Sequence, residues 1–269
     1  MNPAFLETAV KAALAAGNEI LSVYNNDAEV ELKSDNSPLT IADKLAHKKI
    51  VEVLAETLLP VLSEEGKNIL YQERKNWNQF WLVDPLDGTK EFIKRNGEFT
   101  VNIALIENEN PVMGVVYAPV LNILYYAAEN LGSYKCSIDE KFLSKLFTSE
   151  FFETLTQHSQ KLPIENYKNE FTVVASRSHL TSETQSFIND LKLKHGDIKF
   201  ISSGSSLKIC LVAEGTADVY PRLAPTMEWD TAAGHAIAVY SGKSVNCYKN
   251  NESIKYNKEN LLNEWFVVS

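Results

Sequence analysis

Residues 81–92 read WLVDPLDGTKEF and pass from an apolar run into two carboxylates three residues apart, followed by Gly-Thr. Residues 81–83 favour a buried strand, and Pro85 is expected to end its ladder because proline has no N–H. Asp84 would then lie at the carboxyl end of the strand and Asp87 in the following turn. Carboxylates on a tight turn suit Mg²⁺. Asp-Pro and Asp-Gly are also common turn pairs, so the rest of the chain must decide between a metal site and a solvated turn.

The composition of the 269-residue chain is that of a soluble globular protein, with 45% apolar and 23% charged residues. This length is sufficient for a large core or for two lobes. The formal net charge of −9 argues against nucleic-acid polymers as partners, because phosphate backbones are bound by clustered Lys and Arg. A small anionic substrate is compatible with this charge if metal ions supply positive charge.

The cysteines predict a reducing compartment. Cys136, Cys210 and Cys247 are odd in number, far apart and without metal-ligand spacing, so we expect reduced thiols in a cytoplasmic protein. No secretory signal is apparent at the N-terminus. The apolar residues 115–128 are broken by a proline and an asparagine, which predicts two strands around a turn and no membrane span. Oligomeric state and a peripheral association with the cytoplasmic face of the inner membrane stay open.

A second strand of the first half also ends in carboxylates. Residues 61–63 are strand-prone and run into a pair of glutamates, the first of which is Glu64. Glu64, Asp84 and Asp87 would therefore lie together, because open sheets place their sites at the carboxyl ends of strands. Asp43 is expected in the first turn of a helix. It could belong to the same site, or it could only complement the helix dipole.

The remaining pattern predicts an N-terminal α+β lobe over residues 1–136 and a C-terminal α/β lobe over residues 137–269. In the first half, the residue pattern predicts helices at 3–24 and 41–59. It also predicts an antiparallel meander of strands at 99–107, 112–118 and 123–128. The second half predicts strands at 171–175, 198–202, 217–220, 244–248 and 264–268, and helices at 181–193, 207–214 and 231–240. Residues 137–170 are weakly patterned and are interpreted as a lobe boundary or a peripheral insertion.

The second half contains candidate ligand-binding residues of its own. Asp230 precedes a helix rich in small residues and could be its N-cap or face a ligand. GSSLK at 204–208 opens another helix, which is an anion site in principle and also a normal helix start. Ser176 and His179 follow a strand and could contact a ligand or simply face solvent, and Arg222 adds a cation to the same lobe.

Several ionised carboxylates cannot share one pocket without cations. Like charges raise one another's pKa or recruit a metal ion. Two or more Mg²⁺ ions would neutralise the cluster, activate a water molecule and stabilise the leaving oxygen of a phosphoryl displacement.

Four motifs together resemble the inositol monophosphatase superfamily of Mg²⁺-dependent, lithium-sensitive phosphatases. They are Asp84-Pro-Leu-Asp87-Gly-Thr89, Glu64-Glu65 after a strand, Trp229-Asp230-Thr-Ala-Ala-Gly234 and Thr40-Ile-Ala-Asp43. The Asp-x-x-Asp-Gly-Thr spacing differs from the Asp-x-Asp of haloacid-dehalogenase-type phosphatases. Within the superfamily, residues 33–43, 81–102, 202–214 and 229–235 are most similar to the bacterial branch that acts on 3′(2′),5′-bisphosphate nucleotides.

The resemblance implies a layered αβαβα sandwich of two lobes with the site between them. It implies metal ligands at Glu64, Asp84, the Leu86 carbonyl, Asp87 and Asp230, with Asp84 bridging two ions. It implies that Thr89, Asp43 and Glu64 are catalytic, the first two by orienting the attacking water. It implies substrate contacts at Gly88, Thr89, Ser176, His179, Ser205, Lys208, Arg222 and Asp230.

The expected activity is hydrolysis of the 3′-phosphate of adenosine 3′,5′-bisphosphate to AMP and phosphate. 3′-Phosphoadenylyl sulfate is a possible second substrate, and the expected setting is sulfate assimilation and nucleotide recycling. An inositol monophosphatase or related sugar-phosphate phosphatase is the first alternative. A non-catalytic regulator that binds Mg²⁺ or nucleotide is the second, because fold does not fix function.

Overall fold

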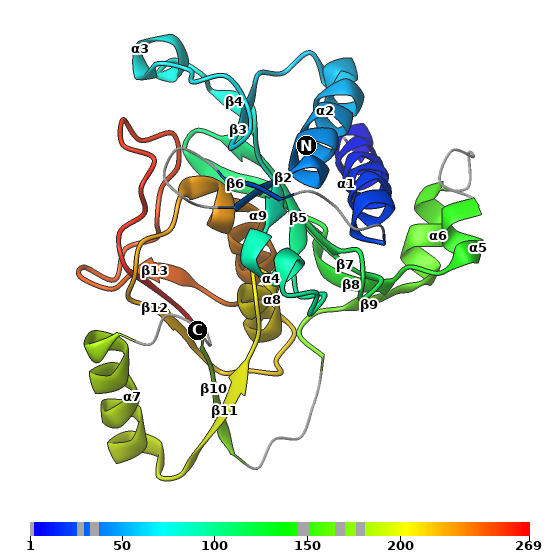
Figure 1. Cartoon of the computed structure of the whole chain (residues 1–269). Coiled ribbons are helices and arrows are strands. Elements are labelled where there is room, and N and C mark those ends of the chain that lie inside the picture. The colour runs from blue at the N-terminus through cyan, green and yellow to red at the C-terminus, as the bar shows by residue number, and fades with distance from the viewer. Residues whose placement is uncertain (1–2, 26–29, 33–37, 145–150, 165–169, 176–180) are drawn as a thin grey trace.

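The computed structural model describes residues 3–25, 30–32, 38–144, 151–164, 170–175 and 181–269 (Figure 1). Its centre is a seven-stranded sheet in the order β3-β4-β5-β6-β7-β8-β9. These strands are β3 (Val61–Ser63), β4 (Gln79–Asp87), β5 (Thr100–Glu107), β6 (Asn110–Ala118), β7 (Ile123–Ala128), β8 (Gly132–Ser137) and β9 (Ser159–Lys161). β3 and β4 pair in parallel, and the other neighbouring strands pair antiparallel.

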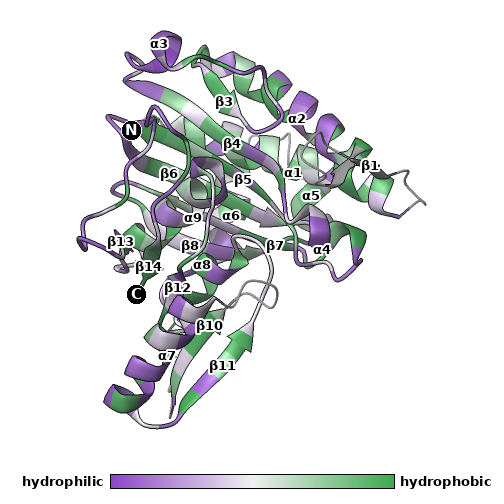
Figure 2. Cartoon of the chain, turned by 60° about the vertical axis from the view of Figure 1, so that its left-hand side comes forward, coloured by the Kyte–Doolittle hydropathy of each residue, from purple (hydrophilic) through white to green (hydrophobic). Residues whose placement is uncertain are grey.

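Helices cover both faces of this sheet. The covering helices are α1 (Pro3–Tyr24) and α2 (Ile41–Leu54) on one face, and α8 (Leu207–Ala213) and α9 (Glu228–Tyr240) on the other (Figure 1). Alternate residues of a strand point to opposite faces. Trp81 and Val83 of β4 therefore join the core under α1, whereas Phe80 and Leu82 join the core under α9. Figure 2 shows hydrophobic residues along the central strands, while the outlying α3 (Tyr71–Arg74) is mainly hydrophilic.

A second set of strands and one helix complete the layers. β10 (Phe171–Ala175) and β11 (Ile198–Ser202) pair in parallel, and β12 (Tyr220–Arg222), β14 (Phe266–Val268) and β13 (Val245–Cys247) form an antiparallel sheet in that order. α7 (Ser182–His195) packs against β11 and β12, and its Ile188 shares a small core with Val173 of β10. The order of helices, sheet, helices, strands and helix confirms the expected αβαβα sandwich.

The remaining elements are short. They are β1 (Val30–Leu32), β2 (Pro38–Thr40), the 3₁₀ helix η1 (Ala55–Thr57), α3 (Tyr71–Arg74), α4 (Thr89–Ile93), α5 (Glu140–Ser144) and α6 (Phe151–Gln157). α6 lies beside α1, since the Lys11 Nζ is 5.3 Å from the centre of the Phe151 ring. Part of the weakly patterned region 137–170 thus covers α1, and β9 extends the central sheet. The division into lobes after residue 136 stays a prediction.

The prediction that Pro85 ends its strand is wrong. β4 continues through Pro85 to Asp87, and its pairing with β5 shifts register between Asp84 and Asp87. A β-bulge leaves a residue without a ladder hydrogen bond, so proline is tolerated there. Asp84 therefore lies inside the strand, and Asp87 is its last residue.

The prediction that Asp230 precedes its helix is also wrong. α9 begins at Glu228, with Met227 at the N-cap position, so Asp230 is the third helical residue. Its Oδ2 accepts a hydrogen bond of 2.8 Å from the Met227 N–H. Such a bond satisfies a backbone donor that the first helical turn leaves open. Asp230 thereby points its carboxylate toward the start of the helix.

Two further boundaries differ from the prediction by three residues or more. The helix expected at 41–59 ends at Leu54 and continues as η1, where the Thr57 hydroxyl donates to the Leu54 carbonyl at 2.7 Å. The strand expected at 217–220 is divided, since Val219 forms an isolated parallel bridge with Val173 of β10, and β12 itself begins only at Tyr220. Over the described residues, none of the helices has the length and apolar content that crossing a membrane requires.

Candidate active site

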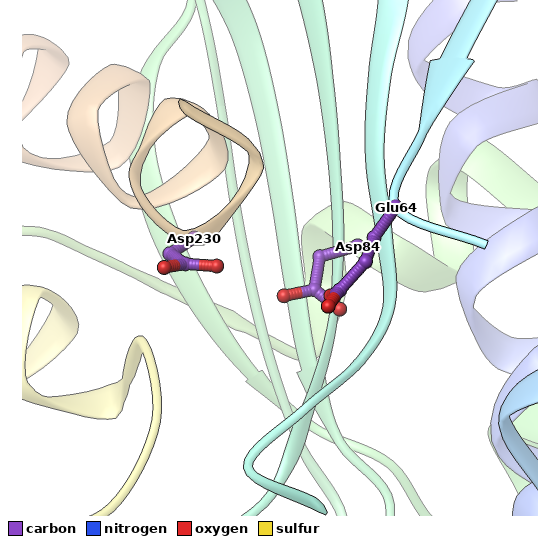
Figure 3. Close-up of side chains that lie close together, drawn as sticks. All are labelled: Glu64, Asp84 and Asp230. Carbon is purple, nitrogen blue, oxygen red and sulfur yellow. The ribbon is translucent and has the colours of Figure 1, made fainter. Parts of the chain in front are cut away.

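Three carboxylates converge where β3 and β4 approach α9. Glu64 follows β3, Asp84 lies in β4 and Asp230 lies in the first turn of α9, and their side chains point toward one another (Figure 3). One ligand oxygen from each lies within 4.8 Å of those of the other two. Backbone bonds fix this geometry, since the Glu64 N–H donates to the Val83 carbonyl and the Leu86 N–H donates to Asp84 Oδ1, both at 3.1 Å. The structure thus brings together three of the four carboxylates predicted to bind metal.

Asp87, the fourth predicted carboxylate, is held from the opposite layer. Its Oδ2 lies 2.8 Å from Ser206 Oγ and 3.4 Å from Asn102 Nδ2. Ser206 directly precedes α8, so this contact joins the central sheet to the helical layer. The Asp87 charge still acts on the cluster, because it raises the pKa of both Asp84 and Asp230.

The environment of the cluster opposes ionised carboxylates in the absence of a cation. Burial raises the pKa of Asp84 well above its ordinary value, and the charges of Glu64 and Asp87 raise it further. Burial also raises the pKa of Asp230 to about 8, with Asp87 adding to the rise and the hydrogen bond from Met227 opposing it. Clustered carboxylates of this kind recruit metal. Because all donors are hard oxygens on a fixed backbone, the residues fit a divalent cation such as Mg²⁺.

Raised carboxyl pKa values predict how the metal-free protein responds to pH. The folded pKa values of Asp84 and Asp230 lie above those of the unfolded chain, so folding favours the protonated forms. The contribution of Asp230 to stability is full below about pH 4 and is lost as the pH rises through about 8, and Asp84 acts in the same direction. In EDTA we therefore expect the Tm to be lower at pH 8 than at pH 6, and Asp230→Asn to reduce that difference. If the Tm of Asp230→Asn in EDTA fell between pH 6 and pH 8 by as much as that of the wild type, the raised pKa of Asp230 would be contradicted.

The turn after β4 leads from the cluster into α4. Gly88 has a φ of 95°, and a Cβ at this position would collide with the Ser205 Oγ, so glycine is required there. Asp43 lies buried in the first turn of α2, and its charge contributes to the raised pKa of Asp84. α4 packs against β2, which runs directly into α2. This arrangement places Thr89 and Asp43 on neighbouring elements, and their catalytic pairing stays a prediction.

Lys208 is enclosed beside the cluster and is not displayed on the surface. Its Nζ donates to the Ser205 carbonyl at 2.6 Å and lies 5.7 Å from the centre of the Tyr220 ring. Burial lowers the pKa of Lys208 to about 8, and the charge of Asp87 opposes this effect. The predicted contact of Lys208 with a nucleotide stays a prediction.

The other predicted substrate contacts have different surroundings. Ser205 Oγ lies 2.7 Å from the Asp87 carbonyl and 2.8 Å from the Glu98 carbonyl, which ties the loop before α8 to the central sheet. The half-buried Arg222 donates to the Pro225 carbonyl at 2.9 Å. Two predicted contacts, Ser176 and His179, lie outside the described residues.

Comparison with known proteins assigns the whole chain to a family. A model of the inositol monophosphatase family matches residues 2–264. The chain belongs to the inositol monophosphatase family. The 3′(2′),5′-bisphosphate nucleotidase CysQ of Salmonella typhimurium is 44% identical over 98% of this chain and 99% of its own length, and that of Escherichia coli K12 is 42% identical over the same shares.

Solved structures agree with this membership. The crystal structure of CysQ from Bacteroides thetaiotaomicron, described as a bacterial member of the inositol monophosphatase family, is 55% identical with a TM-score of 0.88, covering 97% of this chain and 95% of that one. The extragenic suppressor protein suhB of Bartonella henselae is 22% identical with a TM-score of 0.72, covering 98% and 93%, and shares the fold. Members of the family are generally Mg²⁺-dependent, in agreement with the acidic cluster.

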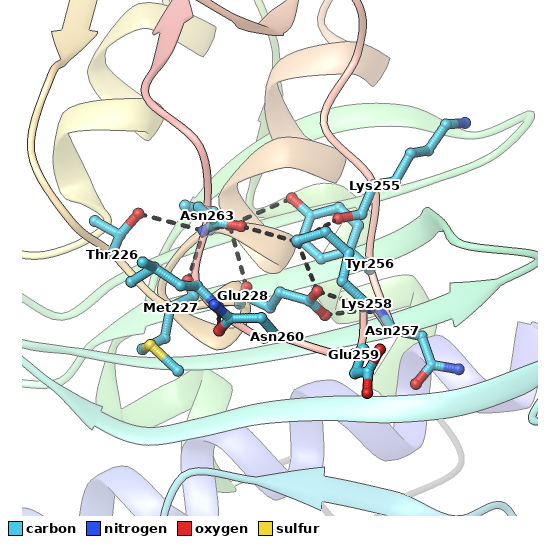
Figure 4. Close-up of polar contacts among 12 residues, drawn as sticks. Thr226, Met227, Glu228, Lys255, Tyr256, Asn257, Lys258, Glu259, Asn260 and Asn263 are labelled. Carbon is cyan, nitrogen blue, oxygen red and sulfur yellow. Dashed lines mark hydrogen bonds and ion pairs between the residues drawn. The ribbon is translucent and has the colours of Figure 1, made fainter. Parts of the chain in front are cut away.

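The C-terminal segment 255–263 holds the start of α9, and with it Asp230 (Figure 4). Glu228 is fully buried, and its carboxylate accepts from the N–H of Asn257 at 2.6 Å and from the N–H of Lys258 at 3.0 Å. The Lys258 ammonium donates to the same carboxylate at 2.6 Å. Breaking these three hydrogen bonds would leave a buried carboxylate without a partner, which is energetically costly. The Glu228 side chain is therefore held firmly in place. Glu228 therefore fixes the helix that carries Asp230.

Removing this anchor is expected to destabilise the fold. Glu228→Ala should lower the free energy of unfolding by about 3 kcal/mol, since it leaves the donors of Asn257 and Lys258 without their carboxylate. Urea unfolding measures the loss. The surface variant Glu252→Ala serves as the control, with an expected change within about 0.5 kcal/mol. Equal midpoints for Glu228→Ala and the wild type would contradict the anchoring role.

Sequence reasoning missed Asn102, Ser206 and Glu228 as supporting residues of the site. Asn102 does carry a signal, because it interrupts the otherwise apolar run of β5 and is 1% exposed. A polar residue in a buried strand requires a partner. Ser206 and Glu228 carry no comparable signal, since serine before a helix and glutamate in a first turn are ordinary.

Proposed function

We propose that this chain is a Mg²⁺-dependent phosphatase that hydrolyses the 3′-phosphate of adenosine 3′,5′-bisphosphate to AMP and phosphate. The observation that carries the phosphatase assignment is the convergence of Glu64, Asp84 and Asp230 within 4.8 Å, from two layers of the fold. The nucleotide assignment is supported by CysQ relatives at 42–55% identity that match nearly their whole length. The proposed setting is sulfur assimilation in the cytoplasm.

The residues proposed to hold two or three Mg²⁺ ions are the carboxylates of Glu64, Asp84, Asp87 and Asp230 and the carbonyl of Leu86. When bound, Mg²⁺ supplies charge neutralisation, a more acidic water and stabilisation of the phosphoryl oxygens. The protein contributes a preformed donor set, because the Leu86 N–H and the Ser206 hydroxyl lie against the carboxylates of Asp84 and Asp87, respectively.

The proposed catalytic work of the chain itself falls to Thr89 and Asp43. A threonine hydroxyl is a poor base alone, but a buried carboxylate that accepts its proton turns Oγ1 into an acceptor for the attacking water. The N–H groups of Gly88 and Thr89 are proposed to hold the scissile phosphate. Glu64 is proposed as a third catalytic residue, which the position of its carboxylate beside Asp84 and Asp230 supports.

The substrate preference is proposed to come from the second half of the chain. Ser205 lies before α8, Lys208 in its first turn and Arg222 in β12. The charge of Arg222 acts on Lys208, and these two cations are proposed to bind the second phosphate of the substrate. Asp230, Ser176 and His179 are proposed to complete the contacts with the nucleotide. 3′-Phosphoadenylyl sulfate carries the same 3′-phosphate on the same nucleoside and is proposed as a second substrate.

A phosphate-release panel tests this proposal. It compares kcat/KM for adenosine 3′,5′-bisphosphate, 3′-phosphoadenylyl sulfate, inositol 1-phosphate and fructose 1,6-bisphosphate, each with Mg²⁺ and with EDTA. The proposal predicts release from the two 3′-phosphorylated nucleotides in Mg²⁺, at least about tenfold faster than from inositol 1-phosphate, and none in EDTA. Faster turnover of inositol 1-phosphate would identify a sugar-phosphate phosphatase. Nucleotide binding without any phosphate release would identify a regulator.

A further inference from the structure

A row of buried hydrogen-bonding side chains ends on the Asp87 carboxylate. Thr100 Oγ1 donates to Asn102 Oδ1 at 2.9 Å, Asn102 Nδ2 donates to Ser206 Oγ at 2.8 Å, and Ser206 Oγ lies 2.8 Å from Asp87 Oδ2. Thr100, Asn102 and Ser206 are 0%, 1% and 3% exposed. Polar groups this deeply buried are costly unless they are paired. The row therefore has a defined arrangement that spans β5, the loop before α8 and the end of β4.

The donors and acceptors of the row leave Ser206 as the donor of its last bond. Ser206 Oγ accepts from Asn102 and has a single hydrogen to donate. Two acceptors lie within reach of that hydrogen, Asp87 Oδ2 at 2.8 Å and the Asp230 backbone carbonyl at 2.7 Å. Hydrogen bonds to a charged acceptor are stronger than those to a neutral one. We therefore assign the hydroxyl hydrogen of Ser206 to the Asp87 carboxylate.

We propose that Ser206 is a positioning residue that orients Asp87 for metal binding, an inference that rests on the proposed role of Asp87 as a Mg²⁺ ligand. Ser206 lies between two proposed ligands from different layers, Asp87 at the end of β4 and Asp230 in α9. Its hydroxyl occupies one carboxylate oxygen of Asp87 and thereby limits the rotation of the side chain. Partners that orient a metal ligand in this way are typically worth 10–100-fold in metal affinity.

A direct Mg²⁺ titration of the metal-free protein tests this role without relying on turnover. Isothermal titration calorimetry with MgCl₂ is expected to show a Kd about tenfold higher for Ser206→Ala than for the wild type. Asn102→Ala is expected to change the Kd in the same direction, because it frees the Ser206 hydroxyl from its partner. The matched control is Ser241→Ala, since Ser241 is also buried and bonded, to the Ala238 carbonyl at 2.7 Å, but lies at the far end of α9. Its Kd should equal that of the wild type.

A purely structural role for Ser206 gives a different result. It would lower the Tm of metal-free Ser206→Ala while leaving the Mg²⁺ Kd at the wild-type value, and this outcome overturns the proposal. If Ser206→Ala does not fold, Ser206→Cys preserves the size of the side chain with a weaker donor and is expected to raise the Kd likewise. A wild-type Kd for the cysteine variant would also overturn the proposal.

An Asp87→Asn variant tests the metal-binding role of Asp87 separately from the positioning role of Ser206. Asp87→Asn should weaken Mg²⁺ binding, and adding Ser206→Ala to it should change the Kd by less than about twofold, because the two changes remove one interaction. Unchanged binding in Asp87→Asn would overturn the metal role of Asp87 and the positioning role with it. Phosphate release by the wild type is measured on the same preparations. If release is absent while the Kd values follow the predicted pattern, the proposed reaction fails and the positioning role stands.

Discussion

Asp84→Asn is expected to lower kcat/KM for adenosine 3′,5′-bisphosphate on the order of a thousandfold while the protein still folds. A thousandfold loss corresponds to about 4 kcal/mol of transition-state stabilisation, a reasonable share for metal-assisted catalysis. Asp84 is the central member of the cluster, since it is 1% exposed and the charges of Glu64, Asp87 and Asp230 all act on it. An amide keeps the acceptor oxygen for the Leu86 N–H but removes the negative charge that a cation requires.

The stability of Asp84→Asn provides the control within the same protein. Because the pKa of Asp84 is raised on folding, its ionised form is destabilising in the metal-free protein at neutral pH. The Tm of Asp84→Asn in EDTA should therefore be equal to or higher than that of the wild type, and the Tm increase caused by Mg²⁺ should be lost. Asp190→Asn, an exposed change on α7, should behave like the wild type. Normal turnover or a normal Mg²⁺ response in Asp84→Asn would refute the metal site.

Thr89→Ala is expected to reduce kcat at least about a hundredfold and to leave Mg²⁺ binding unchanged. Positioned proton transfer contributes roughly 10²–10⁴-fold in enzymes, and the hydroxyl of Thr89 is the group proposed to act on the water. Thr89→Ser keeps the hydroxyl and should retain most of the activity. The measurements are kcat and the Mg²⁺-dependent rise in Tm, which separate a loss of chemistry from a loss of metal.

Asp43 allows a stricter test of the same pair. If Thr89 and Asp43 act as one unit, Asp43→Asn combined with Thr89→Ala should be no more than about threefold slower than the slower single variant. If the two residues contributed independently, the rate losses of the two single variants would multiply. A multiplicative loss, or a Thr89→Ala variant that turns over normally, would exclude the proposed pairing.

The fold was largely predictable because its strands and helices are locally consistent. The run at 123–128 in β7 and the helix over Pro3–Tyr24 have the bounds that their periodicity predicts. The proximity of Glu64 and Asp84 was also predictable, because Glu64 follows β3 and Asp84 lies in its parallel neighbour β4, and parallel strands run toward the same edge of a sheet. Local pattern was therefore sufficient wherever a single element determined the position of a residue.

Other features depend on contacts between segments that are distant in the sequence. Pro85 lies in a bulge that only the pairing of β4 with β5 creates. Asn102 and Ser206 are 104 residues apart, and no periodicity connects them. Lys208 reads as a free cation in the sequence, but the packing of α8 encloses it. These positions are decided by tertiary packing, which overrides local preference.

Identifying the nucleotide product shows which phosphate of adenosine 3′,5′-bisphosphate the protein removes. Wild-type protein is incubated with adenosine 3′,5′-bisphosphate and Mg²⁺, and the nucleotide product is separated by chromatography against 5′-AMP and 3′-AMP standards. We expect 5′-AMP and one equivalent of phosphate, with no reaction in EDTA or with Asp84→Asn. Formation of 3′-AMP, or an unchanged substrate in the presence of Mg²⁺, would contradict this expectation.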